Sequence, residues 1–438
     1  ALADVERCGV VPYLGIPGLD LHAGDLADVT FEVVAVGTRT AGSAAALAAT
    51  YRQWVPGSRP AACHGDAPWI EVLDEHRPDV LFVATPDHLH TAPILEAVDR
   101  GVHVVAEKPL ALSLAEARAI VERSREAGVV VAVDMHKRYD SFLRSAFVDV
   151  VPRLGELLYA RAVLEEPLDV STRVFKWAAH SNPFSYVGVH WTDLFAHYLG
   201  LRPVSLHAVG QKRLLANWRD EDHPQGIDTF DAMQVSVQYH SGLHVSYVNG
   251  WVNPADFEGA VNQELEIVGT RGRVFVDQQD RGMRSAISGA GTRTHNPHFQ
   301  AEVPRADQPG DRVLVGYGKD SLIAGLEAAT RVSLDLADRT ALAGTYPDAE
   351  SAVTCVAILE AAIVSVPSPP SSVCNIAAPR IPAYNNAANT VNISVITRCS
   401  SSGNMLVFGD WSTLTSRCLL FHALRHLTGQ QDAKSLRL

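Results

Sequence analysis

The chain has 438 residues, of which 47% are hydrophobic and 20% charged, so it is long enough for two globular domains with substantial cores. Its net charge of −12 argues against a nucleic-acid partner, because phosphate neutralisation needs basic surface. The six scattered cysteines form no C-x-x-C pair and no histidine pair has metal-ligand surroundings, so no metal is expected. The sequence shows no membrane-length apolar run and no signal pattern, which predicts a cytoplasmic protein without membrane contact.

Apolar strands and helices alternate between residues 29 and 135. The predicted strands are 29–36, 79–85, 102–106 and 129–133, and the predicted helices are 40–53, 67–76, 88–100 and 114–127. Ser113 and Glu116 form a capping box at the start of the last helix. Continuously apolar strands separated by helices indicate a parallel sheet covered on both faces. Residues 1–137 are therefore predicted to form an α/β domain of the nucleotide-binding type.

The pattern changes after residue 138. Predicted strands at 157–164, 204–209, 232–239, 243–248, 264–268 and 273–276 are mostly spaced as in an antiparallel sheet, with helices at 187–199, 320–338 and 347–364. This predicts an α+β domain over residues 138–366. Residues 367–438 carry six Lys/Arg against two Asp, unlike the acidic remainder. A poorly ordered tail is the favoured interpretation, with a coding artefact or a docking tail as alternatives.

Three motifs carry the functional information. The strand 102–106 ends in Glu107-Lys-Pro109, the strand 79–85 continues into Thr85-Pro-Asp-His-Leu-His90, and Gly188 is followed by Asp193 and His197. In this order and spacing the motifs resemble the family of glucose–fructose oxidoreductase and inositol dehydrogenase (Gfo/Idh/MocA-type oxidoreductases). The segment 264–277 resembles a later strand pair of that family, and the resemblance covers residues 29 to 364.

The resemblance implies a Rossmann domain that binds NAD or NADP and a second domain that binds a sugar, cyclitol or related polyol. It implies catalytic roles for Lys108, Asp193 and His197, with His197 as general base. Four residues apart, Asp193 and His197 would share one helix face and both meet the substrate; a surface histidine with an ion partner is the alternative. Further candidates are Thr38, Arg39, Thr85, Pro86, His90, Glu107 and Lys108 for the cofactor, and Arg138, Lys176, Tyr186 and His190 for the substrate.

The sequence departs from the family pattern at two places. No G-x-G-x-x-G turn is visible, since Gly9 and Gly15 have the wrong spacing, so the first strand and the glycine-rich turn are expected to be missing and the domain N-terminally incomplete. After the strand 29–36, no carboxylate is present to bind a ribose. Arg39 could instead pair with a 2′-phosphate, which favours NADP over NAD, although a surface arginine is the simpler alternative.

The leading hypothesis is an NAD(P)-dependent oxidoreductase that transfers hydride between a sugar, cyclitol or polyol hydroxyl and nicotinamide. One alternative is a non-catalytic sugar- or nucleotide-sensing regulator of the same fold, or an inactive fragment. Another is an enzyme that uses transient oxidation for elimination or glycoside cleavage. An exposed sheet face in the second domain predicts a homo-oligomer.

Overall fold

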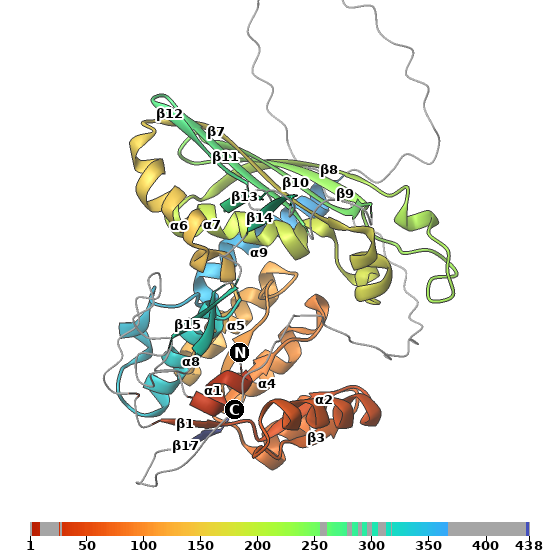
Figure 1. Cartoon of the computed structure of the whole chain (residues 1–438), viewed down its shortest axis with the longest axis vertical. Helices are drawn as coiled ribbons and strands as arrows, with labels where there is room; N and C mark the ends of the chain where they lie inside the picture. The colour runs from red at the N-terminus through yellow and green to blue at the C-terminus, as the bar shows by residue number, and fades with distance from the viewer. Residues whose placement is uncertain are drawn as a thin grey trace, which may run out of the picture.

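The computed structural model describes residues 2–8, 26, 29–254, 261–277, 283–287, 291–295, 300–304, 312–316, 318–366 and 435–437. Within this part of the chain, a six-stranded sheet lies at one end and the parallel strands lie at the other (Figure 1). The helix α9 (Ala349–Ser365) lies between them. Nearly all of the predicted tail falls outside the described residues.

The N-terminal half has the predicted parallel architecture. Strands β4 (Val80–Val83), β5 (His103–Ala106) and β6 (Val131–Val133) pair in parallel, and β2 (Ala35–Thr38) pairs in parallel with β3 (Ala61–His64). Every residue of β5 and β6 is buried, because both faces of the sheet are covered. The covering helices include α2 (Ala41–Trp54), α4 (Thr91–Asp99) and α5 (Leu114–Ala127). This arrangement confirms the predicted Rossmann-type fold class.

The sheet is interrupted between its two groups of strands. Among the described residues, no strand is hydrogen-bonded between the β2–β3 pair and the β4–β5–β6 group. The single strand predicted over 29–36 is wrong: β1 (Thr30–Glu32) pairs with β17 (Ser435–Arg437), whereas β2 pairs with β3. Residues 2–8 form helix α1 (Leu2–Cys8). The segment searched for a glycine-rich turn falls mostly outside the described residues.

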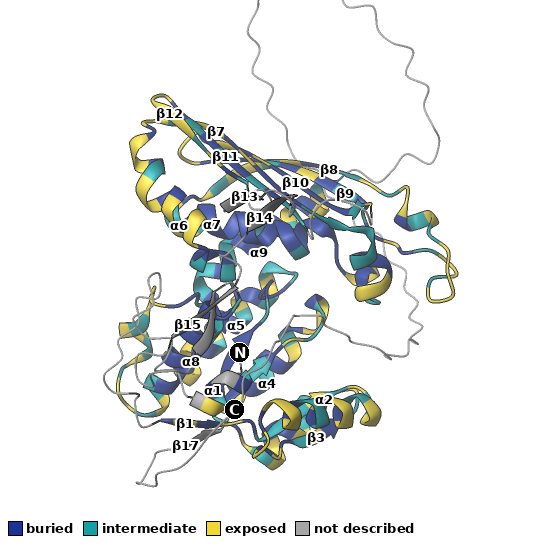
Figure 2. Ribbon diagram, in the orientation of Figure 1, coloured by how far each residue is buried: buried dark blue, intermediate teal, exposed yellow. Residues whose placement is uncertain are grey.

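The second half is built on a mixed sheet that is mostly antiparallel. Its strands, in spatial order, are β12 (Gly272–Asp277), β11 (Asn262–Gly269), β7 (Leu157–Pro167), β10 (His244–Asn253), β9 (Ala232–Tyr239) and β8 (Pro203–Gln211). Only the β7–β10 pair is parallel within this sheet. Buried residues alternate with less buried ones along β9, so one face of the sheet is covered. Helices α7 (Val189–Leu199) and α9 lie under this face (Figure 2).

The helix α8 (Asp320–Ser333) packs on the parallel sheet, although the sequence grouping places it with the second domain. At Gly325 the approach is so close that an added Cβ would lie 2.6 Å from the Cβ of Ala132. After α8 the chain returns through α9, which packs against both α5 and α7. The two halves are therefore connected by a shared helix as well as by the chain at residue 138.

The remaining elements are short. They are α3 (Pro68–Glu71), α6 (Ser141–Ser145), β13 (Met283–Ile287), β14 (Gly291–His295), β15 (Gln300–Pro304) and β16 (Arg312–Gly316). Of the helices described, none has the length and apolar character that crossing a membrane requires.

Candidate active site

Lys108 follows the buried strand β5 at the carboxyl edge of the parallel sheet, where open α/β sheets bind their ligands. Its side chain is buried, and the peptide bond to Pro109 is cis. The ammonium Nζ donates a hydrogen bond of 2.8 Å to the carbonyl of Tyr186. The same atom lies 3.5 Å from the centroid of the Tyr186 ring, which is a cation–π contact. The lysine of the first half is thus anchored to a residue of the second half.

The two strand-end loops beside Lys108 are joined by His90. This fully buried histidine places Nδ1 2.7 Å from the carbonyl of Pro109 and Nε2 2.8 Å from the carbonyl of Thr85. Because both ring nitrogens contact protein carbonyls, His90 positions the loops rather than presenting a free nitrogen to a cofactor. The Thr85 hydroxyl is different: its Oγ1 is buried without a hydrogen-bond partner. It is available to a ligand at this edge.

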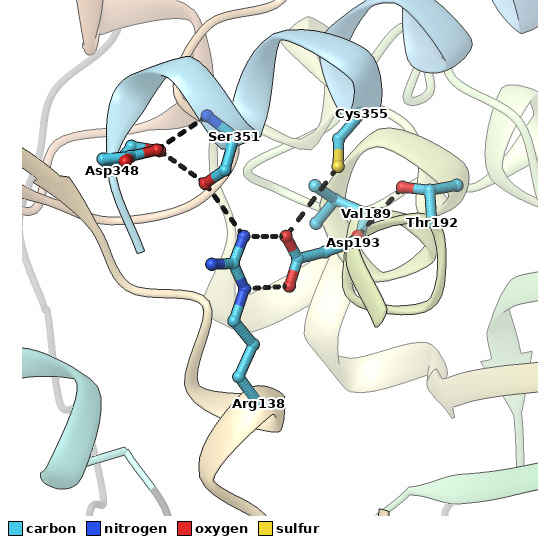
Figure 3. Close-up of polar contacts among 7 residues, drawn as sticks. All are labelled: Arg138, Val189, Thr192, Asp193, Asp348, Ser351 and Cys355. Carbon is cyan, nitrogen blue, oxygen red and sulfur yellow. Dashed lines mark hydrogen bonds and ion pairs between the residues drawn. The ribbon is translucent and has the colours of Figure 1, made fainter. Parts of the chain in front are cut away.

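Arg138 and Asp193 form a buried, bidentate ion pair (Figure 3). Nε of Arg138 lies 2.8 Å from Oδ2 of Asp193, and Nη2 lies 2.5 Å from Oδ1. Nη2 also donates to Oγ of Ser351 at 3.0 Å, and Sγ of Cys355 lies 3.9 Å from Oδ1. Burial lowers the pKa of Arg138, but Asp193 raises it by more, so the guanidinium stays charged. The pair joins α7 to α9 and to the loop after β6.

The structure places Asp193 and His197, which are predicted to meet the substrate together, in different surroundings. Both carboxylate oxygens of Asp193 accept hydrogen bonds from Arg138. His197 lies in the last turn of α7, where its side chain is exposed and its ring packs on Tyr198 at 4.7 Å. The seven residues from Val189 to Phe195 are all buried. Asp193 is therefore buried in a protein ion pair, whereas His197 lies at the exposed end of the helix.

His190 is the histidine of α7 that faces the charged groups around Lys108. It is 4% exposed, and its Nδ1 is buried without a hydrogen-bond partner. Its ring lies 4.5 Å from that of His136. Burial, His136 and the positive charges of Lys108 and Lys137 hold the pKa of His190 well below its usual value. This imidazole is therefore neutral and can accept a proton.

Two carboxyl groups near Lys108 were missed in the sequence. Glu166, at the end of β7, accepts a hydrogen bond of 2.9 Å from Nε1 of Trp251. Asp87, which follows Pro86, accepts one of 2.6 Å from Oγ of Ser181, a residue of the second half. Burial raises the pKa of both carboxyl groups, whereas Lys108 lowers it. Glu166 had a sequence signal, because it continues the inward-facing series Ala160, Ala162 and Leu164 of β7.

The remaining predicted residues lie in three places. Burial and Asp134 raise the pKa of Glu107, beside Lys108. Lys176 forms an ion pair of 3.3 Å with Asp222 in the second half. Thr38 ends β2, with its Oγ1 2.6 Å from Oγ of Ser43, and the exposed Arg39 follows it just before α2.

A surface cavity of about 720 Å³ lies at the opposite edge of the parallel sheet. It is lined at the starts of β4 and β5 by residues such as Asp79 and His103. Its Arg100 is already paired with Asp74 at 2.8 Å. Ligands of open α/β sheets bind at the carboxyl ends of the strands, so this cavity is not a cofactor site. Nor do the described residues contain a cluster of three or more side chains suited to a metal ion.

The parallel half, the mixed sheet and the lysine between them define an oxidoreductase of the dinucleotide-binding class. The family model described as "Oxidoreductase family, NAD-binding Rossmann fold" matches residues 14–135, and "GFO/IDH/MocA C-terminal domain" matches residues 152–275. Together they span more than half of the chain, which belongs to the GFO/IDH/MocA family. NAD or NADP is accordingly the cofactor. Among the described residues, the Thr85 hydroxyl, which has no hydrogen-bond partner, and the Lys108 ammonium are polar groups at the carboxyl edge of the sheet, where such a cofactor binds.

Two relatives are similar in sequence to part of this chain. The scyllo-inositol 2-dehydrogenase (NAD(+)) of Bacillus subtilis is 24% identical over 277 residues, covering 61% of this chain and 76% of the relative. The 1,5-anhydro-D-fructose reductase of Ensifer adhaerens is 28% identical over 196 residues, covering 44% of this chain and only 58% of the relative.

A solved structure shows the same fold. The scyllo-inositol dehydrogenase of Lactobacillus casei, with bound NAD(H) and scyllo-inositol, has a TM-score of 0.54 and 16% identity. The match covers 82% of this chain and 94% of that one.

Proposed function

We propose that this protein is an NAD(P)-dependent oxidoreductase that transfers hydride between nicotinamide and a hydroxyl of a sugar, cyclitol or related polyol. The observation that carries the proposal is the meeting of two groups: Lys108 of the first half, whose Nζ binds the Tyr186 carbonyl, and the buried His190 of the second half, whose Nδ1 has no hydrogen-bond partner and whose pKa is lowered by burial and by the charge of Lys108. Names of relatives such as scyllo-inositol 2-dehydrogenase and 1,5-anhydro-D-fructose reductase support this substrate class.

Each of the two residues has a distinct role in this proposal. The ammonium of Lys108 carries three donors, of which one binds the Tyr186 carbonyl, so the others can bind the substrate oxygen and stabilise its developing negative charge. The neutral imidazole of His190 takes the hydroxyl proton. Bound NAD(P) supplies the hydride acceptor. The Arg138–Asp193 pair holds α7, and with it His190, in place.

The test is turnover of a panel of hexoses and cyclitols with NAD and with NADP, followed by nucleotide absorbance. Reduction of either nucleotide by a panel member supports the proposal. If the protein binds nucleotide but reduces none with any polyol, the proposal fails. Product analysis separates net oxidation from elimination or glycoside cleavage.

The preference for NADP remains a proposal that rests on Arg39. This exposed side chain follows β2 directly and precedes the first turn of α2, a place suited to a 2′-phosphate. The printed names of relatives mention NAD. Equal or better use of NAD at matched concentrations would contradict the preference.

The alternative, a sugar- or nucleotide-sensing regulator of the same fold, makes a different prediction. A sensor would bind polyol or nucleotide without producing reduced nucleotide, so the same turnover measurement distinguishes the two functions. The cytoplasmic location and the homo-oligomer stay predictions.

A further inference from the structure

Glu166 lies on the covered face of the six-stranded sheet, at the end nearest Lys108. Along β7 the side chains of Ala160, Ala162 and Leu164 are buried in the core, and Glu166 is the next residue in this alternation. The neighbouring Glu165 has different partners: its Oε2 accepts from Asn262 at 3.1 Å. Burying a carboxyl group on an otherwise apolar strand face is costly unless its oxygens are hydrogen-bonded.

Only one of the two oxygens of the Glu166 carboxyl group accepts a hydrogen bond from the described part of the protein. Oε2 accepts a hydrogen bond of 2.9 Å from Nε1 of the fully buried Trp251. Oε1 has no hydrogen-bond partner within the described part of the chain. One oxygen is therefore fixed by the protein, while the other can accept a hydrogen bond from a ligand.

Aromatic rings connect Glu166 to the proposed reaction site. The Trp251 ring lies 6.0 Å from that of Tyr186, and Tyr186 lies under the Lys108 ammonium at 3.5 Å. The half-buried rings of Phe175 and Trp177 lie 4.7 Å and 5.9 Å from Tyr186. Aromatic faces with a few placed polar groups are typical of sites for small ligands. The C–H faces of a polyol ring can pack on such rings while its hydroxyls bind the polar groups.

Burial, opposed by nearby positive charges, determines the pKa of Glu166. Burial raises its pKa to about 7, although Lys108, the indole N–H of Trp251 and Lys137 lower it, and Asp87 raises it further. The acid form therefore predominates below pH 7 and the carboxylate above it. A carboxylate accepts stronger hydrogen bonds than a neutral acid.

We propose that Glu166 is a specificity-determining residue that accepts a hydrogen bond from a second hydroxyl of the polyol substrate, beside the hydroxyl that meets Lys108 and His190. This assignment rests on the proposed function. It predicts that the site distinguishes polyols from analogues that lack one hydroxyl, and that the affinity for the polyol rises with pH through the ionisation of Glu166.

The experiment compares the wild type with Glu166→Gln, which keeps an oxygen acceptor for Trp251 but cannot ionise. Binding of hexoses, cyclitols and their deoxy analogues is titrated by tryptophan fluorescence, since Trp177 and Trp251 lie beside the proposed site. At pH 8.5 we expect Glu166→Gln to weaken polyol binding roughly tenfold or more, the effect of losing a charge-assisted hydrogen bond. At pH 6 the two proteins should differ much less, and one deoxy analogue should bind both equally.

The matched control is Glu165→Gln, on the same strand, which should leave binding unchanged at either pH. A merely structural Glu166 would give equal affinities for wild type and Glu166→Gln across the pH range, and this result would overturn the assignment. A panel in which no polyol changes the fluorescence of the wild type would also overturn it. Failure of the proposed function looks different: polyol binding would depend on Glu166 as expected, but no nucleotide would be reduced.

Discussion

Two charged clusters lie between the two halves of the molecule, and they differ in how fully their polar atoms are used. In the Arg138–Asp193 cluster, both carboxylate oxygens accept from the guanidinium, and Ser351 accepts a further bond. In the Lys108–His190 cluster, Nδ1 of the buried His190 has no partner. The first cluster is complete within the protein and stabilises it. The second contains a buried nitrogen without a hydrogen-bond partner. Mutations in the first cluster should therefore lower stability most, and mutations in the second should lower turnover most.

The largest effect is expected on stability, from breaking the complete cluster. Replacing Asp193 by Ala leaves the buried Arg138 unpaired, which should cost about 3–5 kcal/mol of unfolding free energy. Urea denaturation measures this loss. The double variant Arg138→Met, Asp193→Leu should recover much of it, because no charge is then left unpaired. If Asp193→Ala unfolds at the wild-type denaturant midpoint, the distinction between the clusters fails.

Replacing Lys108 by Ala should have the largest effect on turnover. Loss of the ammonium that binds the substrate oxygen is expected to lower kcat about 100- to 1,000-fold. Steady-state kinetics with the active polyol, together with circular dichroism to verify the fold, measure this change. An active Lys108→Ala variant would contradict the proposed role.

Replacing His190 by Ala should lower kcat about 100-fold, as removal of a general base does. Because the pKa of His190 is lowered, it stays neutral into acid, and the acid limb of kcat in the wild type, measured at saturating polyol so that the effect of Glu166 on binding does not enter, should fall below the ordinary histidine value of about 6.5. His197→Ala is the control, since this exposed histidine should be replaceable at little cost. The reverse ranking of the two histidines would restore the sequence-based assignment.

The smallest effect is expected at the nucleotide end. Replacing Arg39 by Ala should weaken NADP binding roughly tenfold while leaving NAD nearly unchanged, because only NADP carries the 2′-phosphate. Titration of each nucleotide measures both affinities. A parallel loss for NAD would indicate that Arg39 acts on the loop rather than on the phosphate.

The sequence predicted the fold and Lys108 for clear physical reasons. Apolar strands alternating with helices have few solutions other than a covered parallel sheet, and a lysine directly after a buried strand must lie at its carboxyl edge. Glu166 could also have been found, since it falls on the inward side of an alternating strand. Successive side chains of a strand point to opposite faces of the sheet, and this alternation can be derived from the sequence without knowledge of tertiary contacts.

The rest of the site required tertiary contacts. Arg138 and Asp193 are 55 residues apart in the chain, and nothing local shows that each satisfies the other. The i, i+4 spacing placed Asp193 and His197 near each other on α7, but spacing does not say which residues of the helix face the first half. The sequence suggests only packing or substrate contact for His190, because the missing hydrogen-bond partner of its Nδ1 is evident only in the folded structure.

The hydrogen bond from Lys108 to residue 186 ends on the main-chain carbonyl, not on the tyrosine side chain. Every amino acid supplies that acceptor. A substitution at position 186 therefore removes the ring beneath the ammonium but keeps this hydrogen bond. The main chain fixes the position of the Lys108 nitrogen, and only the cation–π contact depends on which side chain is present at 186.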